Sequence, residues 1–256
     1  MANNGLNICL IGDILRTDAA FDRVSVAERL DRYNLQKEAS VFRAVQQICN
    51  ALPRAQQIWL AICLFCIAIA QVDQPYPSVA PLHHIPTLIL VLLAPVMLRR
   101  WPISNQALIC LILFFLLHTL GGRYTYTNTP YDLWTHYLFG LELTELFDWQ
   151  RNHYDRLVHF GFGVLMVYPV KEILTRYARV SSGLAIYIAL EFVMGISAVY
   201  EVVEWLLSIV LAGDAAESYN GQQGDIWDAQ KDMALAFLGA LITSSWLILR
   251  RRMRKG

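Results

Sequence analysis

Uncharged, mostly apolar runs recur along the chain at lengths that fit a lipid bilayer. Four of them, at positions 55–72, 74–98, 101–122 and 233–249, contain 18, 25, 22 and 17 residues. A helix that spans a bilayer needs about 17–25 predominantly apolar residues. The runs therefore predict membrane helices over Gln57–Val72, His84–Leu98, Ile103–Leu120 and Met233–Leu249.

Two further membrane helices are predicted between the third and the last of these runs. One covers about 157–174, where Pro169 is expected to kink the helix because proline removes a backbone donor. The other covers about 182–211, and at ~1.5 Å per residue its length of about 45 Å exceeds the ~30 Å hydrocarbon core. We expect it to tilt or bend, with Gly195 as the bend point. The predicted fold class is all-α, a polytopic six-helix transmembrane bundle.

The basic residues predict the orientation of this bundle. Of the 21 Lys and Arg residues, 17 fall in the two tails and in the second and fourth connections. Positive residues concentrate in cytoplasmic loops, so both termini should be cytoplasmic. The expected organisation begins with a cytoplasmic tail (1–56), three helices (57–120) and an extracytoplasmic connection (121–156). Three helices that carry the polar cluster (157–249) and a basic cytoplasmic tail (250–256) follow.

Composition supports the same class. Hydrophobic residues make up 56% and charged residues 16% of the chain, against roughly 45–50% and 25% in an average soluble domain. This imbalance argues against a soluble enzyme, and the equal numbers of basic and acidic residues argue against nucleic acid as a partner. The expected environment is a lipid bilayer.

Charged residues interrupt the predicted helices only in the second half of the chain. Ser197, Glu201, Glu204 and Ser208 stand at i, i+4, i+7 and i+11, which places them in one stripe on a helix. A charged side chain at mid-membrane costs about 2.5–3.5 kcal/mol on insertion scales, so these carboxylates need partners or protons. The stripe should face the interior of the bundle.

Two more polar sets lie at the same expected depth. Asp155 and His159 are four residues apart at the outer start of one helix. Asp225, Asp228 and Asp232 lie at i, i+3 and i+7 on one face at the outer start of the last helix. Carboxylates and imidazoles are the ligands that Zn, Mn or Fe sites use, and they would equally suit a proton relay. The candidate catalytic residues are Asp155, Glu201 and Glu204, and the candidate ligands of a divalent metal ion are His159, Glu204, Asp228 and Asp232.

Structural interpretations remain open for the same residues. Asp225 follows a glycine at a helix start and could cap the helix without binding a ligand. Glu201 and Glu204 could pair with basic residues only to brace the bundle; the candidates are Arg123, Arg156 and Lys231. His83, His84 and His136 are more typical of loop residues than of ligands.

Four segments resemble the YjdF-like family of bacterial inner-membrane proteins. They are GGRYTY (121–126), HYDRLVHFGFG (153–163), YEVVEW (200–205) and GQQGDIWDAQKDM (221–233), within a match over about Leu82 to Leu249. The resemblance implies a six-helix all-α membrane protein and does not assign a reaction. It points to eleven polar positions: Arg123, Tyr124, His153, Asp155, His159, Tyr200, Glu201, Glu204, Asp225, Asp228 and Asp232. A fainter pattern likeness to VanZ-like membrane proteins, which also carry an Asp-x-x-x-His-Phe motif, hints at association with the cell envelope.

Three functions fit this pattern. The first is a cation-binding membrane protein that performs hydrolytic or transfer chemistry on a lipid or cell-envelope substrate. The second is a small transporter that uses the carboxylates for ions or protons. The third is a structural or accessory protein whose ion pairs brace the bundle.

Overall fold

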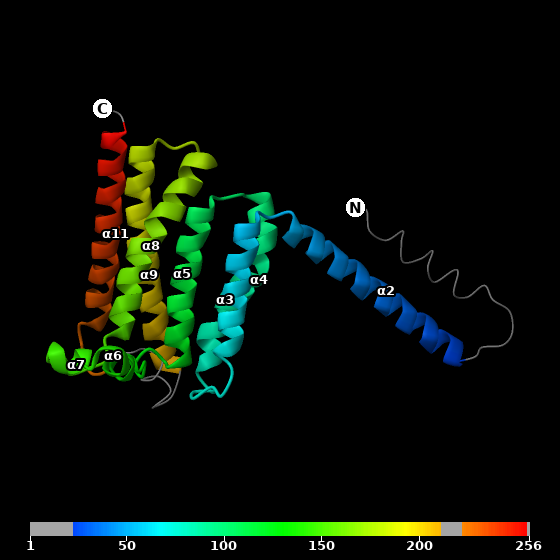
Figure 1. The fold of residues 1–256 in the computed structure, drawn as a ribbon, viewed down its shortest axis with the longest axis horizontal. Helices are drawn as coiled ribbons and strands as arrows, with labels where there is room; N and C mark the ends of the chain where they lie inside the picture. The colour runs from blue at the N-terminus through cyan, green and yellow to red at the C-terminus, as the bar shows by residue number, and fades with distance from the viewer. Residues whose placement is uncertain (1–22, 211–221, 255–256) are drawn as a thin grey trace. The chain divides into compact units, whose positions relative to one another are not determined.

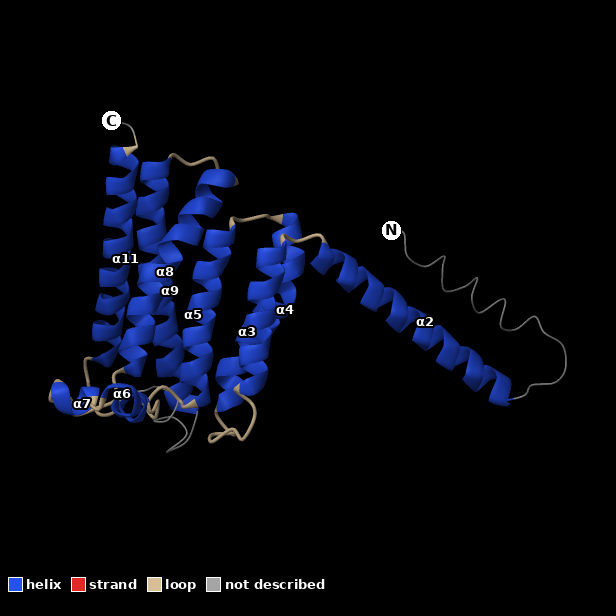
Figure 2. Cartoon of the chain, viewed as in Figure 1, coloured by secondary structure: helices blue, strands red, loops and turns tan. Residues whose placement is uncertain are grey.

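The regular secondary structure of the described part of the chain is all helical, as the sequence predicts. The computed structural model describes residues 23–210 and 222–254, in which no strand occurs. Figure 2 shows the helices and the loops that join them. The helices are α2 (Arg23–Asn50), α3 (Arg54–Ile69), α4 (Ala80–Arg100), α5 (Asn105–Arg123), α6 (Tyr131–Phe139), α7 (Leu143–Leu146), α8 (Tyr154–Arg176), α9 (Ser182–Val210) and α11 (Asp228–Met253).

Residues up to Gln47 form a unit of their own. Helix α2 fills the described part of this unit, and its described side chains from Glu28 to Gln47 are exposed. Arg32 and Glu28 form an exposed ion pair of 3.6 Å one turn apart. An exposed pair of this kind adds little to stability, so α2 is a polar helix without a packed core in its described part.

Residues 48–256 form the second unit, which carries the predicted membrane segments. Five of its described helices, α4, α5, α8, α9 and α11, are long and apolar enough to cross a membrane. Helix α3 is also apolar but has 16 residues, a length of about 24 Å. The chain is therefore a polytopic membrane protein.

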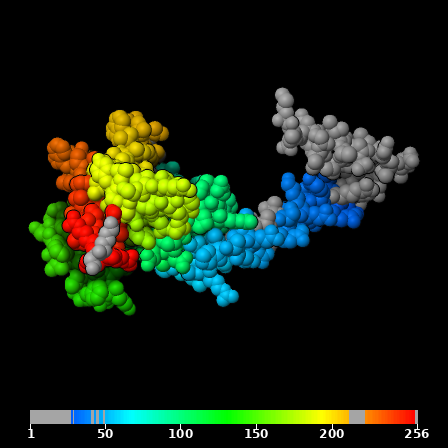
Figure 3. Space-filling model, turned by 90° about the horizontal axis from the view of Figure 1, so that it is seen from above, coloured from blue at the N-terminus to red at the C-terminus, as the bar shows by residue number. Residues whose placement is uncertain are grey.

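Helix α8 is the centre of this unit. It packs on α5, α9 and α11, while α3, α4 and α5 pack on one another. In Figure 1 these helices run side by side, and the short helices α6 and α7 lie at the end where α8 and α11 begin. We call that end the polar end. Figure 3, viewed from the opposite end, shows the α8–α9 connection beside the end of α11.

The backbones of α8 and α11 approach closely because each helix presents a glycine to the backbone of the other. A Cβ atom added to Gly163 would lie 1.9 Å from the carbonyl oxygen of Ala236, and one added to Gly239 would lie 2.4 Å from that of Phe160. Small residues allow membrane helices to approach this closely and to gain van der Waals contact. The contact fixes the register of α8 against α11, and the polar ends of the same two helices carry the candidate site.

A carboxylate joins α5 to α8 at the end opposite the polar end. Glu172 accepts hydrogen bonds from the backbone amide and the hydroxyl of Ser104, the N-cap residue of α5. Arg176 forms an ion pair of 3.1 Å with Glu172 and donates to the carbonyl of Pro102. A negative group is favourable at a helix N-terminus, so this joint holds the two halves of the bundle together.

The helix boundaries differ from the prediction mainly at the polar end. Helix α11 begins at Asp228 rather than near Met233, and α8 begins at Tyr154 rather than near Leu157. Apolar patterning marks only the apolar part of a helix, whereas the first turns of both helices are polar. The predicted connection 121–156 contains α6 and α7, and α8 and α9 continue as helices through Pro169 and Gly195.

Candidate functional site

A network of ion pairs ties the start of α8 to the start of α11. Arg156 Nη2 lies 2.6 Å from Asp225 Oδ2, and Arg151 Nη1 lies 2.6 Å from Asp228 Oδ1. Lys231 Nζ also lies 2.6 Å from Asp225 Oδ2. Both arginines are largely buried, with side chains 10% and 15% exposed, so the network is shielded better than a surface ion pair. We call these five residues the clamp.

Asp225 is both a clamp residue and part of the turn that precedes α11, whose N-cap residue is Trp227. Its Oδ1 accepts a hydrogen bond of 3.0 Å from the backbone amide of Trp227, just before α11 begins at Asp228. The prediction that three aspartates share one face of this helix is therefore wrong for Asp225, because the helix starts three residues later. Asp228 and Asp232 do lie one turn apart on α11.

The clamp makes a testable contribution to pH-dependent stability. The hydrogen bond from Lys231, together with those from the Trp227 amide and the Arg156 guanidinium, lowers the pKa of Asp225 to about 2. A carboxyl group with a folded-state pKa below its unfolded value stabilises the fold above about pH 4, and this contribution disappears as the pH falls through about 2. We expect Asp225→Asn to lower the thermal unfolding midpoint at pH 7 and to match the parent near pH 2. A difference that persists unchanged at the lower pH would contradict this role.

A second polar group lies directly beneath the clamp. Asp155 and His159 on α8 and Asp232 on α11 each offer a ligand atom, and the three atoms lie within 4.8 Å of one another. His159 Nε2 is 3.7 Å from Asp155 Oδ1 and 3.5 Å from Glu201 Oε1 of α9. Tyr200 donates a hydrogen bond to Glu204, one turn further along α9. We call Asp155, His159, Glu201, Glu204 and Asp232 the inner cluster.

The inner cluster is buried and incompletely hydrogen-bonded. Asp232 is 1% exposed, and its Oδ1 has no hydrogen-bond partner within the described residues. Oε1 of Glu201 is likewise buried without a hydrogen bond in this part of the chain. An unsatisfied buried carboxylate oxygen is costly and calls for a proton, a water molecule or a cation.

The basic residues that were candidates for ion pairs with Glu201 and Glu204 bind other groups. Arg156 and Lys231 belong to the clamp, and Arg123 donates to the carbonyl oxygens of Ala70 and Val72 at 2.9 and 2.7 Å. Arg123 thereby covers the C-terminal end of α3. Within residues 23–210 and 222–254, neither Glu201 nor Glu204 forms an ion pair with these three residues.

Three further motif residues, Tyr200, Tyr124 and His153, make contacts between aromatic rings. The ring of Tyr200 lies edge-on to His159 at 5.8 Å, and the ring of Tyr124 lies against Trp134 at 5.9 Å. His153 stacks on Trp149 at 4.3 Å next to the clamp. Burial, together with the charges of Arg156 and Arg151, lowers the pKa of His153. His153 is therefore neutral at pH 7 and contributes packing rather than charge.

His83, His84 and His118 lie at the contact between α4 and α5. His83 and His84 lie inside α4 at 2% and 4% exposure, so the expectation that they are loop residues is wrong. His84 Nε2 donates to the carbonyl of Thr119 at 3.1 Å. His118 Nε2 donates to the carbonyl of His83 at 3.1 Å, and its Nδ1 accepts a hydrogen bond from the hydroxyl of Tyr126.

His136 was also expected in a loop but lies in the short helix α6. Its Nδ1 is 3.4 Å from Glu142 Oε1, and both side chains are exposed. His136 is therefore apart from the buried histidines. The contacts of His83, His84 and His118 join residues 35 positions apart, which hydrophobic patterning does not detect.

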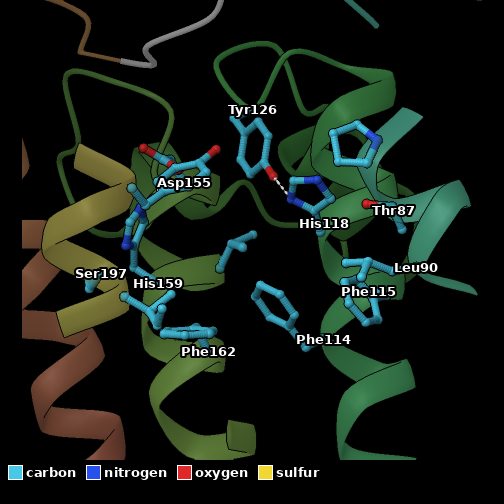
Figure 4. A pocket seen from close by; sticks show the side chains of 14 residues that line it. Thr87, Leu90, Phe114, Phe115, His118, Tyr126, Asp155, His159, Phe162 and Ser197 are labelled. Atoms are coloured by element: carbon cyan, nitrogen blue, oxygen red, sulfur yellow. Dashed lines mark hydrogen bonds and ion pairs between the residues drawn. The ribbon is translucent and has the colours of Figure 1, made fainter. Parts of the chain in front are cut away.

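A cavity of about 280 Å³ separates the Tyr126–His118 pair from the inner cluster. Figure 4 shows Asp155 and His159 on one side and His118 with Tyr126 on the other, while Phe114 and Phe162 lie further from the polar end. We call this space the site cavity. The lining residues are Pro86, Thr87, Leu90, Phe114, Phe115, His118, Tyr126, Asp155, Val158, His159, Phe162, Ile196, Ser197 and Tyr200. It combines a polar end with apolar walls, as small-molecule sites do.

The sequence comparisons identify the family. The inner membrane protein YjdF of Escherichia coli (strain K12) is 35% identical over 164 residues, which cover 63% of this chain and 74% of that protein. No solved structure matches the chain. The family model described as "Predicted membrane protein (DUF2238)" matches residues 55–253, which include every helix from α4 to α11 and all of the clamp and inner cluster. The chain therefore belongs to this family of inner-membrane proteins.

Proposed function

We propose that the protein binds one divalent cation in the inner cluster and uses it for hydrolytic or transfer chemistry on a lipid or cell-envelope substrate. One observation carries the proposal: buried ligand atoms of Asp155, His159 and Asp232 lie within 4.8 Å of one another. Ligand atoms at 2.0–2.2 Å from a tetrahedral zinc ion are about 3.3–3.6 Å apart. The widest pair in the cluster needs to close by about 1 Å for the three atoms to share an ion.

The donor set limits the choice of metal. Two carboxylates and one imidazole supply oxygen and nitrogen donors without a thiolate, a set that suits Zn²⁺, Mn²⁺ or Fe²⁺. The cluster faces the site cavity, because Asp155 and His159 line that cavity. A cation held by three protein ligands keeps a coordination position for water or substrate.

The two glutamates of α9 are the candidates for proton transfer. Glu201 is within 3.5 Å of His159, and Glu204 is buried one turn away. A carboxylate next to a bound cation can take the proton of an attacking water molecule and return it to a leaving group. Asp228, which pairs with both arginines of the clamp, is assigned to holding the start of α11 rather than to the metal.

Elemental analysis of the purified protein tests this function. We expect about one equivalent of Zn, Mn or Fe per chain, removal by a chelator, and a rise in the thermal unfolding midpoint when the metal is returned. The absence of metal, together with no stabilisation by any of the three ions, would leave the carboxylates as bracing groups and refute the proposal.

We further propose that α3 is a sixth span and that both termini are cytoplasmic. Helix α3 packs on α4 and α5, and the 17 basic residues described above would then lie on the cytoplasmic side. Its length of about 24 Å is short for a bilayer, which a local thinning of the lipid can accommodate. The polar end then faces outward.

Cysteine labelling tests the orientation. In a chain whose five native cysteines are replaced, Asn128→Cys should react with an impermeant thiol reagent in intact cells. Ala178→Cys, which is also exposed but lies on the α8–α9 connection, should react only after the membrane is opened. Reporters fused before Asn3 and after Gly256 should both be cytoplasmic. The reverse labelling pattern would overturn the orientation.

A further inference from the structure

A second cavity continues from the site cavity toward the opposite end of the bundle. It has a volume of about 510 Å³ and is lined by apolar residues of α3, α4, α5 and α8, with Trp101 and Tyr177 at its far end. Leu90 and Phe115 line both cavities, so the two spaces adjoin end to end at these side chains. We call the two adjoining cavities the chain path.

The chain path is longer than one leaflet of a bilayer. Asp155 lines its polar end and Ile173 its far end, 18 residues apart on α8. At about 1.5 Å per residue the path is about 27 Å long, close to the ~30 Å thickness of the whole hydrocarbon core. An ordinary acyl chain reaches only half of that thickness.

The carboxylate and imidazole groups that line the path lie at one end of it. Asp155 and His159 face His118 and Tyr126 across the site cavity, as Figure 4 shows. The lining of the site cavity contains one carboxylate, Asp155, and no Lys or Arg, and the lining of the second cavity contains no Asp, Glu, Lys, Arg or His. A ligand with a polar head and a long apolar tail matches this distribution.

The path is open to the surrounding lipid. Leu90, at the junction, is 46% exposed although it lines both cavities. The site cavity is lined by residues of α4 and of α9. Helix α4 packs on α3 and α5, whereas α9 packs on α8 and α11. An amphiphile can therefore enter sideways from the membrane with its tail still in an apolar environment.

We propose that the substrate of the metal site is an amphiphile with one chain longer than a leaflet, of the polyprenyl class. Its head lies between the inner cluster and the Tyr126–His118 pair, and its tail follows the chain path to Trp101 and Tyr177. A two-chain phospholipid does not fit, because its chains would enter side by side while the cavities meet end to end. The role of this amphiphile as substrate rests on the proposed function, whereas its binding does not.

Photolabelling of the full-length protein tests the chain path. The probe is a long-chain polyprenol that carries a photoreactive group at the far end of its chain. Peptides that contain Trp101 or Ile173 should be labelled, and unlabelled polyprenol should compete at least tenfold better than dioleoyl phosphatidylcholine. Leu90→Trp, which fills the junction, should lower the labelling about tenfold.

Leu93→Trp is the matched control. Leu93 lies on the same helix, is 50% exposed and lines neither cavity, so its replacement should leave labelling unchanged. Undiminished labelling of Leu90→Trp, or equal competition by the phospholipid, would overturn the proposal. Metal content measured in the same samples separates the two ideas: labelling that depends on Leu90 in a protein without metal supports the chain path and refutes the metal-dependent function.

Discussion

Replacing Asp232 by asparagine or His159 by alanine should lower the metal content of the purified protein at least about tenfold. Each change removes one of the three buried donors that lie within 4.8 Å of one another, and the two remaining donors cannot hold the ion at comparable affinity. Glu204→Gln should instead leave the metal content near that of the parent, because Glu204 is assigned to proton transfer and is not one of these three donors. The helical content should be retained, because none of these changes opens a large cavity. Elemental analysis and circular dichroism measure the two properties on one sample.

Asp225→Asn is the matched control for Asp232→Asn. The chemical change is identical and lies close to the start of the same helix, but Asp225 pairs with Lys231 and Arg156 in the clamp. Its replacement should leave the metal content unchanged, as should serine in place of Cys63 or Cys66. If the ligand variants instead unfold and the parent never contains metal, the inner cluster is structural and the enzymatic proposal fails.

Gly163→Ala is expected to have the largest effect on stability of any single change in the bundle. The added methyl group would lie 1.9 Å from the carbonyl oxygen of Ala236 and 2.8 Å from the backbone nitrogen of Ala240. Backbone atoms cannot yield as a flexible side chain can, so α8 and α11 must separate. We expect a loss of about 3 kcal/mol or more, measured by thermal or denaturant unfolding in detergent. Metal binding should weaken in parallel, because the ligands lie on the same two helices.

Gly195→Ala provides the control. Gly195 lies within α9, and a methyl group added there meets nothing within 4 Å. Because alanine favours a helix over glycine by roughly 0.5–1 kcal/mol, this variant should be as stable as the parent or slightly more stable. Equal unfolding midpoints for the two alanine variants would show that the backbones of α8 and α11 are not in contact.

The class of the fold and the central pair of the site follow from local patterns. Uncharged runs mark the membrane helices because the bilayer requires long apolar segments. Asp155 and His159 stand one helical turn apart in the sequence, so any helix brings them to one face. The meeting of α8 with Asp232 on α11 was inferred from similar depth alone, and the structure places these residues together.

Other parts of the site depend on contacts that no local pattern encodes. Tyr126 and His118 meet across a turn, and they carry no charge that would mark them as unusual in an apolar segment. The sequence pattern does not distinguish Glu172, because this residue lies near the end of a predicted helix, where acidic residues are common. Its bond to Ser104 joins positions 68 residues apart. The division of the acids into clamp and inner cluster likewise depends on where Arg151 and Arg156 point.

The contribution of α11 to the inner cluster also constrains how the protein is made. Asp155, His159 and the α9 glutamates are synthesised before Asp232, so these groups enter the bilayer before their last partner exists. Buried carboxylates in lipid are costly, and membrane helices assemble after each has been inserted. The nascent chain must therefore hold these acids protonated, or near the headgroups, until the C-terminal helix leaves the ribosome and docks along Gly163. Completion of the inner cluster is then a late event of assembly, and a chain that ends before α11 cannot form it.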